Sequence, residues 1–305
     1  MEVSAQYEVY LQLCTHFQHI SNSPTTCFPV NENHLIRLWW GHHKWMNGSV
    51  YKIYHQLKSR DVYDIYLSKD VNPTLLDEVV LYPMRQLYKE FSQGHIKGRT
   101  LLQFNPGPAP YKLLVCCDFF EEINVLEFNE ENSKELRKWL KKDPGALDWT
   151  RASQYACTLE GKSNGWIEKE EQLRERIKRV IDCDLTADPL VTPGTLPPVD
   201  CILSIGGLES IINDQDNFRK NLGKMAALLK VGGHVAFFGA INGKSYKVGE
   251  HLVPCFGYNE GFLKAALRDT GFVIESLERR PGVDISDYII YDSFVYVRAR
   301  KVRET

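Results

Sequence analysis

The sequence lacks the features that mark a secreted, membrane-spanning or nucleic-acid-binding protein. No apolar run approaches the length needed to cross a bilayer, and the amino terminus has no basic segment followed by an apolar core. We therefore expect neither a membrane association nor a secretory signal. The formal net charge is -2 over 305 residues, with no long block of one sign. A surface for nucleic acid is not expected either.

The cysteines and histidines show no metal-binding pattern. The eight cysteines form no C-x-x-C pair, and the adjacent Cys116 and Cys117 are poorly placed to share one tetrahedral metal ion. Most of the nine histidines lie in residues 1–60, but without a recognisable ligand spacing. We predict no metal site, and we interpret residues 1–60 as an aromatic-rich N-terminal cap. Free thiols favour a cytoplasmic protein.

What the sequence does have is a regular alternation of strand-like and helix-like segments from Leu101 to Gly239. Such alternation predicts a parallel sheet with helices on both faces and a ligand site at the carboxyl ends of the strands. Two further apolar segments follow one another without a helix between them, so they should pair antiparallel. The five strand-like runs are 100–104, 123–126, 180–183, 199–204 and 235–238, and the final two segments are 272–277 and 289–298.

The loop after the first strand favours one class of cofactor over another. The pattern G-x-G-x-x-G is absent, and Pro106, Pro108 and Pro110 lack the backbone N–H groups that would bind a pyrophosphate. Glu127 ends the second strand, twenty residues after Gly107, a position that suits the two hydroxyls of a ribose. A nucleoside without phosphates fits this pattern better, which favours S-adenosylmethionine over NAD.

Six short segments are informative beyond their periodicity: 105–111, 135–144, 146–149, 183–186, 196–201 and 228–233. They resemble one small enzyme family, the nicotinamide, phenylethanolamine and indolethylamine N-methyltransferases. The resemblance covers roughly Val62 to Lys301. It implies an α/β fold with a seven-stranded Rossmann-like methyltransferase sheet, mostly parallel with an antiparallel last strand. This domain would span residues 61–305, after an N-terminal helical cap of residues 1–60.

The resemblance also implies which residues bind S-adenosylmethionine. Asn105, Gly107 and Tyr111 match the loop that lies along the methionine part of the cofactor. Glu127 matches the acidic residue that holds the ribose, and Asn132 matches a polar residue beside it. These five residues are therefore expected to bind the methionine and ribose parts.

The same resemblance places the adenine and the methyl acceptor. Asp184 and Leu185 match the pair that brackets the adenine, with the carboxylate accepting from its exocyclic amine. Glu209 matches the acidic residue that faces the acceptor amine, and it is the expected catalytic residue. Ala240 and Tyr246 match positions that line the acceptor pocket. The implied partner is a small-molecule amine.

Three departures from the family pattern leave two functions open. Gln103 and Asn105, with Pro106 next, replace an acidic residue and a glycine in the cofactor loop. In the family, a lid at the N-terminal side of the domain carries a pair of tyrosines, and the matching stretch here is Val79-Val80. Gly239 replaces an acidic residue that contacts the acceptor in the family. The chain is expected to be either an N-methyltransferase for a small amine, or a catalytically degenerate relative with a binding or structural role.

Overall fold

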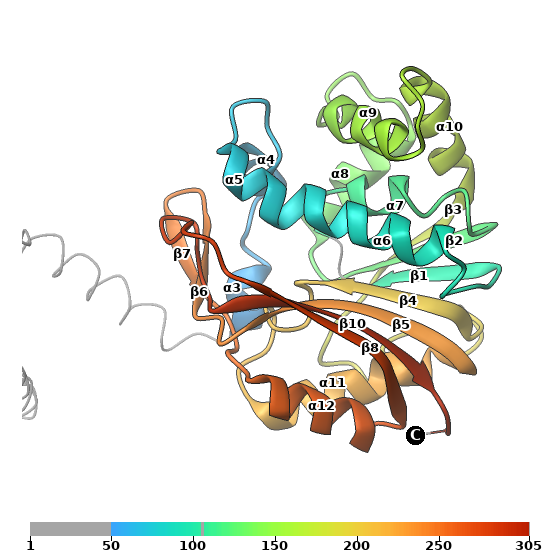
Figure 1. The fold of residues 1–305 in the computed structure, drawn as a ribbon, viewed down its shortest axis with the longest axis vertical. Coiled ribbons are helices and arrows are strands. Elements are labelled where there is room, and N and C mark those ends of the chain that lie inside the picture. The colour runs from blue at the N-terminus through green and yellow to red at the C-terminus, as the bar shows by residue number, and fades with distance from the viewer. Residues whose placement is uncertain (1–49, 105–106, 305) are drawn as a thin grey trace, which may run out of the picture. The chain divides into compact units, whose positions relative to one another are not determined.

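A seven-stranded sheet forms the centre of the computed structural model, which describes residues 50–104 and 107–304 (Figure 1). The strand order is β3-β2-β1-β4-β5-β10-β8. Strands β1 to β5 run parallel, and β10 is antiparallel to both of its neighbours. This confirms the predicted sheet. The strands are β1 (Thr100–Phe104), β2 (Glu122–Glu127), β3 (Ile177–Asp182), β4 (Val199–Ile205), β5 (Leu229–Ile241), β8 (Phe272–Pro281) and β10 (Ser293–Lys301).

Helices cover both faces of this sheet. Figure 1 shows α6 to α10 on one face, and α11 and α12 on the other. Central strands covered on both faces need apolar residues on both sides, so β1 and β4 are near-continuous apolar runs. The helices on the first face are α6 (Tyr82–Ser92), α7 (Tyr111–Leu114), α8 (Glu130–Leu140), α9 (Thr150–Leu159) and α10 (Trp166–Arg176). Those on the second are α11 (Gln215–Ala227) and α12 (Glu260–Asp269).

A second, three-stranded sheet was not anticipated from the sequence. It consists of β6 (Ser245–Val248), β7 (His251–Pro254) and β9 (Ile289–Ile290), in the order β7-β6-β9. The single strand expected over residues 289–298 is therefore divided between two sheets. The change occurs at Asp292, whose N–H donates to the carbonyl of Ile241 at the end of β5. The small sheet brings Tyr246 close to the carboxyl edge of the main sheet.

The amino-terminal boundary also differs from the expected one. The chain divides into residues 1–47 and a compact unit of residues 48–305. The unit contains α3 (Val50–Tyr54), α4 (Ser59–Tyr66), α5 (Pro73–Leu76) and the π-helical turn η1 (Asp77–Leu81). The predicted cap of residues 1–60 includes α3, whose carbonyl at Tyr54 accepts a hydrogen bond from the side chain of Asn129 in the main domain. None of the described helices is long and apolar enough to span a membrane.

Candidate active site

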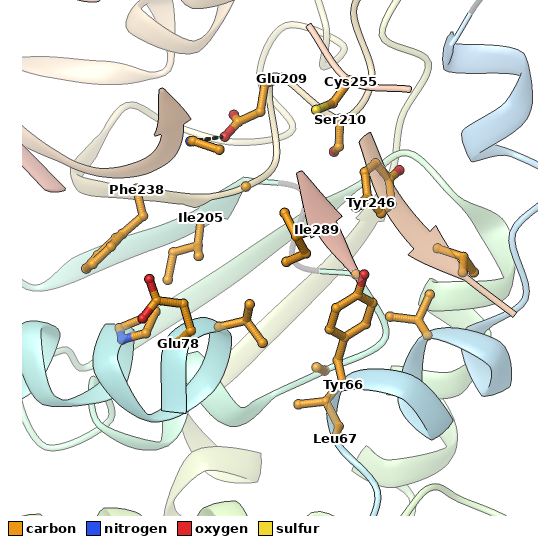
Figure 2. Close-up of a pocket in the computed structure, with 18 of the residues that line it drawn as sticks. Tyr66, Leu67, Glu78, Ile205, Glu209, Ser210, Phe238, Tyr246, Cys255 and Ile289 are labelled. Atoms are coloured by element: carbon orange, nitrogen blue, oxygen red, sulfur yellow. Dashed lines mark hydrogen bonds between the residues drawn. The ribbon is translucent and has the colours of Figure 1, made fainter. Parts of the chain in front are cut away.

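A cavity of about 240 Å³ opens at the carboxyl ends of β1, β4 and β5. Most of its wall is apolar, with side chains such as Ile205, Phe238 and Ile289 (Figure 2). The residues with polar side chains in the wall are Tyr54, Tyr66, Glu78, Tyr82, Tyr111, Lys112, Asn132, Glu209, Ser210, Ser245, Tyr246 and Cys255.

Glu209 follows β4 and presents a carboxylate to this cavity. One oxygen, Oε1, accepts a hydrogen bond of 3.1 Å from the backbone N–H of Ala240 (Figure 2). The other oxygen, Oε2, is buried and has no hydrogen-bond partner among the described residues. Burial raises the pKa of Glu209 to about 7, against the opposing effects of its N–H donors and the charge of Lys112. This carboxyl group can therefore gain or lose a proton near neutral pH.

Gly239 lies directly beside Glu209, but its lack of a side chain does not enlarge the cavity. A Cβ at this position would collide with the hydroxyl of Tyr258 and would lie 3.1 Å from Oε1 of Glu209. Tyr258 is buried just before α12 and fills the space. An acidic side chain at position 239 would need a different position for this tyrosine.

Glu127 ends β2 and is the centre of a buried hydrogen-bond network. Its carboxylate accepts from the N–H of Gly107 at 3.0 Å and from the hydroxyl of Tyr54 at 3.0 Å. It also accepts from the N–H groups of the next two residues, each at 2.9 Å, and from the Asn132 side chain at 3.4 Å. Burial raises the pKa of Glu127, although these donors oppose the shift. The network connects β2 to α3, α8 and the loop after β1.

The local backbone explains how the network is assembled. Gly107 has a φ of +71°, a conformation that glycine adopts without strain. Asn129 caps α8 by accepting from the N–H of Glu131 at 2.9 Å, which sets the start of the helix one turn before Asn132. The Asn129 side chain also donates to the carbonyls of Tyr54 and Leu57, at 2.7 and 3.1 Å. The cap therefore positions α8 and α3 together.

Tyr51 of α3 contacts both residues expected to bracket the adenine. Its hydroxyl donates to Oδ1 of Asp184 at 3.2 Å and accepts from the N–H of Leu185 at 2.9 Å. Burial raises the pKa of Tyr51 to about 12, so its hydroxyl stays protonated at neutral pH. Tyr51 and Tyr54, one turn of α3 apart, thus hold the polar groups at the ends of β2 and β3.

The structure brings most of the predicted site residues together. Six of the predicted residues line the cavity, namely Gly107, Tyr111, Asn132, Glu209, Ala240 and Tyr246. Glu127 lies immediately behind the wall, whereas Asp184 and Leu185 lie outside the cavity, where they contact Tyr51. Asn105 and Pro106 lie outside the described residues.

The departures near the lid have structural consequences of their own. Val79 lines the cavity, and its carbonyl accepts from the hydroxyl of Tyr111 at 3.2 Å. Gln103 is buried, and neither of its side-chain polar atoms has a partner among the described residues. Five of the described tyrosines line the cavity. Tyr111 and Tyr246 were predicted, whereas Tyr54, Tyr66 and Tyr82 were not.

Sequence reasoning also missed Lys112. It lies in α7, directly after the predicted cofactor loop, and it is buried in the cavity wall. A lysine between Tyr111 and an otherwise apolar run was the available signal, because a buried lysine is rare unless it has a specific partner.

Comparison with known proteins defines the class. A model of the NNMT/PNMT/TEMT family matches residues 48–302. The protein is thus an S-adenosylmethionine-dependent methyltransferase with a Rossmann-like sheet. The chain belongs to the NNMT/PNMT/TEMT family, as the sequence segments predicted.

Individual relatives support this membership. The chain is 39% identical to the indolethylamine N-methyltransferase of Oryctolagus cuniculus, over 73% of this chain and 84% of the relative. It is 38% identical to the phenylethanolamine N-methyltransferase of Macaca mulatta, over 64% and 70% of the two chains. Identity to the nicotinamide N-methyltransferase of Homo sapiens is 33%, over 72% and 83%. Similarity is therefore spread over relatives with different named acceptors.

The buried carboxyl of Glu209 leads to a prediction about stability. Its pKa is about 7 in the folded protein and 4.5 as the ordinary value, so the folded state holds this proton more tightly. Folding is then progressively disfavoured as the pH rises from about 4.5 to 7, and the total cost is about 3 kcal/mol. Glu209→Gln should remove this cost and raise the thermal midpoint at pH 8 clearly more than at pH 5.

Thermal unfolding of both proteins between pH 5 and pH 8 measures the effect. The exposed Glu250→Gln serves as the control for the loss of one negative charge. A stability difference between Glu209→Gln and the parent protein that is the same at every pH would contradict the assignment.

Proposed function

We propose that this protein transfers a methyl group from S-adenosylmethionine to the nitrogen of a small-molecule amine. The observation that carries the proposal is the carboxylate of Glu209. One of its oxygens accepts from the N–H of Ala240, and the other is buried without a partner among the described residues, on a side chain that lines the cavity. A buried acceptor of this kind suits an N–H group of a ligand.

The residues present fit the cofactor at its polar parts. Glu127 and Asn132 provide a carboxylate and an amide side by side for the ribose hydroxyls. Asp184 and the N–H of Leu185 provide an acceptor and a donor for the adenine edge. When bound, the cofactor supplies a methyl group on a positively charged sulfur. Tyr51 holds Asp184 and Leu185, so adenine has to take over its hydrogen bonds.

The protein's contribution to such a transfer is mainly to position the reactants. Holding two reactants in a productive orientation can lower the barrier by about 7–11 kcal/mol. The walls formed by residues such as Val79, Ile205 and Phe238 exclude water and restrict the acceptor. Glu209 orients the acceptor nitrogen and receives its proton, directly or through water.

The charge of Glu209 depends on what is bound. A neighbouring sulfonium and amine favour the charged form of this carboxyl group. Burial works in the opposite direction and brings the pKa to about 7 without a ligand. A carboxyl group with this pKa is well suited to accept a proton at neutral pH.

The acceptor is proposed to be a simple monoamine. A second carboxylate in the wall, Glu78, is already paired, with the hydroxyl of Tyr291 at 2.8 Å and with Arg280 at 3.0 Å. Position 239 adds no further acid. Most of the wall is apolar, so polyhydroxylated or doubly charged acceptors should be disfavoured.

We also propose a cytoplasmic location. All six cysteines among the described residues are free thiols, which is the usual state in a reducing compartment.

The alternative function is a catalytically degenerate protein with a binding or structural role. The observation that favours it is the occupation of the expected adenine and ribose contacts by Tyr51 and Tyr54. Isothermal titration with S-adenosylmethionine separates the two functions. Binding in the micromolar range supports the enzyme, and no binding at millimolar concentration would reject it.

Removing the hydroxyl of Tyr51 should strengthen cofactor binding. Tyr51→Phe keeps the ring but frees Asp184 and Leu185, and each lost hydrogen bond is worth about 0.5–1.5 kcal/mol. The dissociation constant for S-adenosylmethionine should fall by roughly tenfold. Tyr63→Phe is a matched control, because its hydroxyl donates to the carbonyl of Asp148 instead. Unchanged affinity in Tyr51→Phe would show that adenine does not use this pair.

Loss of the Glu127 charge should weaken cofactor binding. Glu127→Gln keeps the shape of the side chain but removes the charge-assisted hydrogen bonds expected from the ribose, each worth about 1.5–3 kcal/mol. Affinity for S-adenosylmethionine should drop at least about tenfold. Titration calorimetry measures the change, after circular dichroism has verified folding. Equal binding by the variant and the parent protein would place the ribose elsewhere.

Glu209 should affect turnover and not cofactor binding. Glu209→Gln keeps the hydrogen bond from Ala240 but cannot take a proton, so methylation of amines should fall by about 10²–10⁴-fold. Cofactor affinity should stay nearly unchanged. The assay is transfer of radiolabelled methyl groups to a panel of amines. Equal turnover by both proteins would remove Glu209 from the mechanism.

A further inference from the structure

Tyr258 is a buried tyrosine whose ring and hydroxyl have different surroundings. It lies just before α12, and its side chain is 3% exposed. The ring packs in an aromatic cluster, with its centre 5.3 Å from Phe218, 6.1 Å from Phe256 and 6.3 Å from Phe262. The hydroxyl is buried without a hydrogen-bond partner among the described residues. A phenylalanine would pack here without leaving a buried hydroxyl unsatisfied, so packing alone does not account for a tyrosine.

The hydroxyl of Tyr258 lies over Gly239, beside the carboxyl group of Glu209. A Cβ added to Gly239 would collide with this hydroxyl and would lie 3.1 Å from Oε1 of Glu209. The two side chains therefore approach the same point on β5. The other oxygen of Glu209, Oε2, also has no partner among the described residues. A small rotation of the carboxyl group, or one buried water molecule, is enough to connect the hydroxyl to the carboxyl group.

The backbone holds Tyr258 against Glu209 from outside the cavity. The N–H of Phe256 donates to the carbonyl of Glu209 at 2.9 Å, and the carbonyl of Tyr258 accepts from the N–H of Asn242 at 2.8 Å. Glu209 lines the cavity, whereas Tyr258 does not. A molecule bound in the cavity therefore does not compete with Tyr258 for its place.

We propose that Tyr258 is a positioning residue whose hydroxyl donates to the ionised carboxylate of Glu209, directly or through one water molecule. This role rests on the proposed function, in which Glu209 orients the acceptor nitrogen and receives its proton. A hydrogen bond to a charged acceptor is stronger than one to a neutral carboxyl group, so the hydroxyl favours the ionised form. Tyr258 thereby keeps Glu209 available as a proton acceptor at neutral pH, against the effect of burial.

The other ionisable side chains around Glu209 determine which pH range is informative. Burial and the charge of Glu209 raise the pKa of Tyr258 well above its usual value, so its hydroxyl remains a donor. Tyr246 and Cys255 also stay protonated, because burial raises the pKa of each. Lys112, whose charge favours the ionised form of Glu209, has a pKa that burial lowers to about 8. Among these groups, only Glu209 and Lys112 titrate between pH 5 and pH 8.

A thermodynamic cycle tests the contact without an assay of activity. Thermal unfolding is measured at pH 5 and pH 8 for the parent protein, Tyr258→Phe, Glu209→Gln and the double variant. Loss of the donor raises the folded-state pKa of Glu209 further, so ionisation destabilises the fold more as the pH rises. Tyr258→Phe should therefore lower the thermal midpoint by roughly 2 °C more at pH 8 than at pH 5. In the Glu209→Gln background its effect should be the same at both pH values, which separates it from the titration of Lys112.

Two further variants complete this experiment. Tyr258→Leu, which removes the same hydroxyl with a smaller side chain, should show the same additional loss at pH 8. Tyr296→Phe is the matched control, because its hydroxyl is also buried without a partner among the described residues, but Glu90 and Glu278 are the carboxylates that act on it. The effect of Tyr296→Phe on the thermal midpoint should not depend on Glu209→Gln.

The pH profile of methyl transfer tests the role of Tyr258 in the proposed reaction. The turnover number kcat for an amine should rise as Glu209 ionises. Tyr258→Phe should move this rise to higher pH by about one unit, because it removes a donor to the charged form. A residue that only supports the packing would lower kcat at every pH without moving the profile.

The possible failures can be told apart. An equal loss of thermal midpoint at pH 5 and pH 8 would overturn the contact between Tyr258 and Glu209. The expected pH-dependent loss together with an unmoved kcat profile would overturn the role of Tyr258 in the reaction. The same loss in a protein that methylates no amine of the panel would reject the proposed function and leave the contact in place.

Discussion

The buried carboxylate of Glu127 is the interaction on which the arrangement of the site depends. It accepts hydrogen bonds from the loop after β1, from α3 and from α8, besides the backbone that follows β2. These segments are far apart in the sequence and meet only at the carboxyl edge of the sheet. Without a charged acceptor at this point, several buried donors would lose their partner, and each loss costs about 1–3 kcal/mol. The carboxylate of Glu127 therefore fixes the shape of the loop after β1 and the position of α3, which covers the site.

Around the cavity, burial disfavours the charged forms of two ionisable side chains. Burial raises the pKa of Glu209 to about 7 and lowers that of Lys112 to about 8, which means that both charged forms are disfavoured by the folded protein. Groups of this kind are retained where a ligand compensates for the missing water. Asp184, in contrast, is exposed, and the neighbouring Thr186 is the main cause that lowers its pKa. The two groups whose charged forms are disfavoured thus line the cavity, whereas Asp184 lies outside it.

The covering helix α3 gives this site a property that the strand ends alone would not have. In the function proposed above, Tyr51 and Tyr54 make hydrogen bonds that the nucleoside of the cofactor would otherwise make, so that ligand binding would be an exchange of partners and not a simple addition. The apparent affinity for any nucleoside then includes the free energy needed to displace the hydroxyl of Tyr51. This exchange connects the position of α3 directly to the occupancy of the site.

The sequence by itself determined the α/β class, the order of the main strands along the chain and the family. The class and the strand order depend on local periodicity. The family depends on segments such as 135–144, which can be recognised from the sequence without knowledge of tertiary contacts. The sequence also pointed to Glu127, through its place at the end of the second strand twenty residues after Gly107, and the family resemblance pointed to Glu209. Only the tertiary structure decided that α3 belongs to the domain, that residues 289–298 divide between two sheets, and that Tyr258 fills the space at Gly239. The small strands are too short to give a periodic signal. The burial of Lys112 and the hydrogen bonds of Tyr51 arise from contacts between distant segments, which no local pattern encodes.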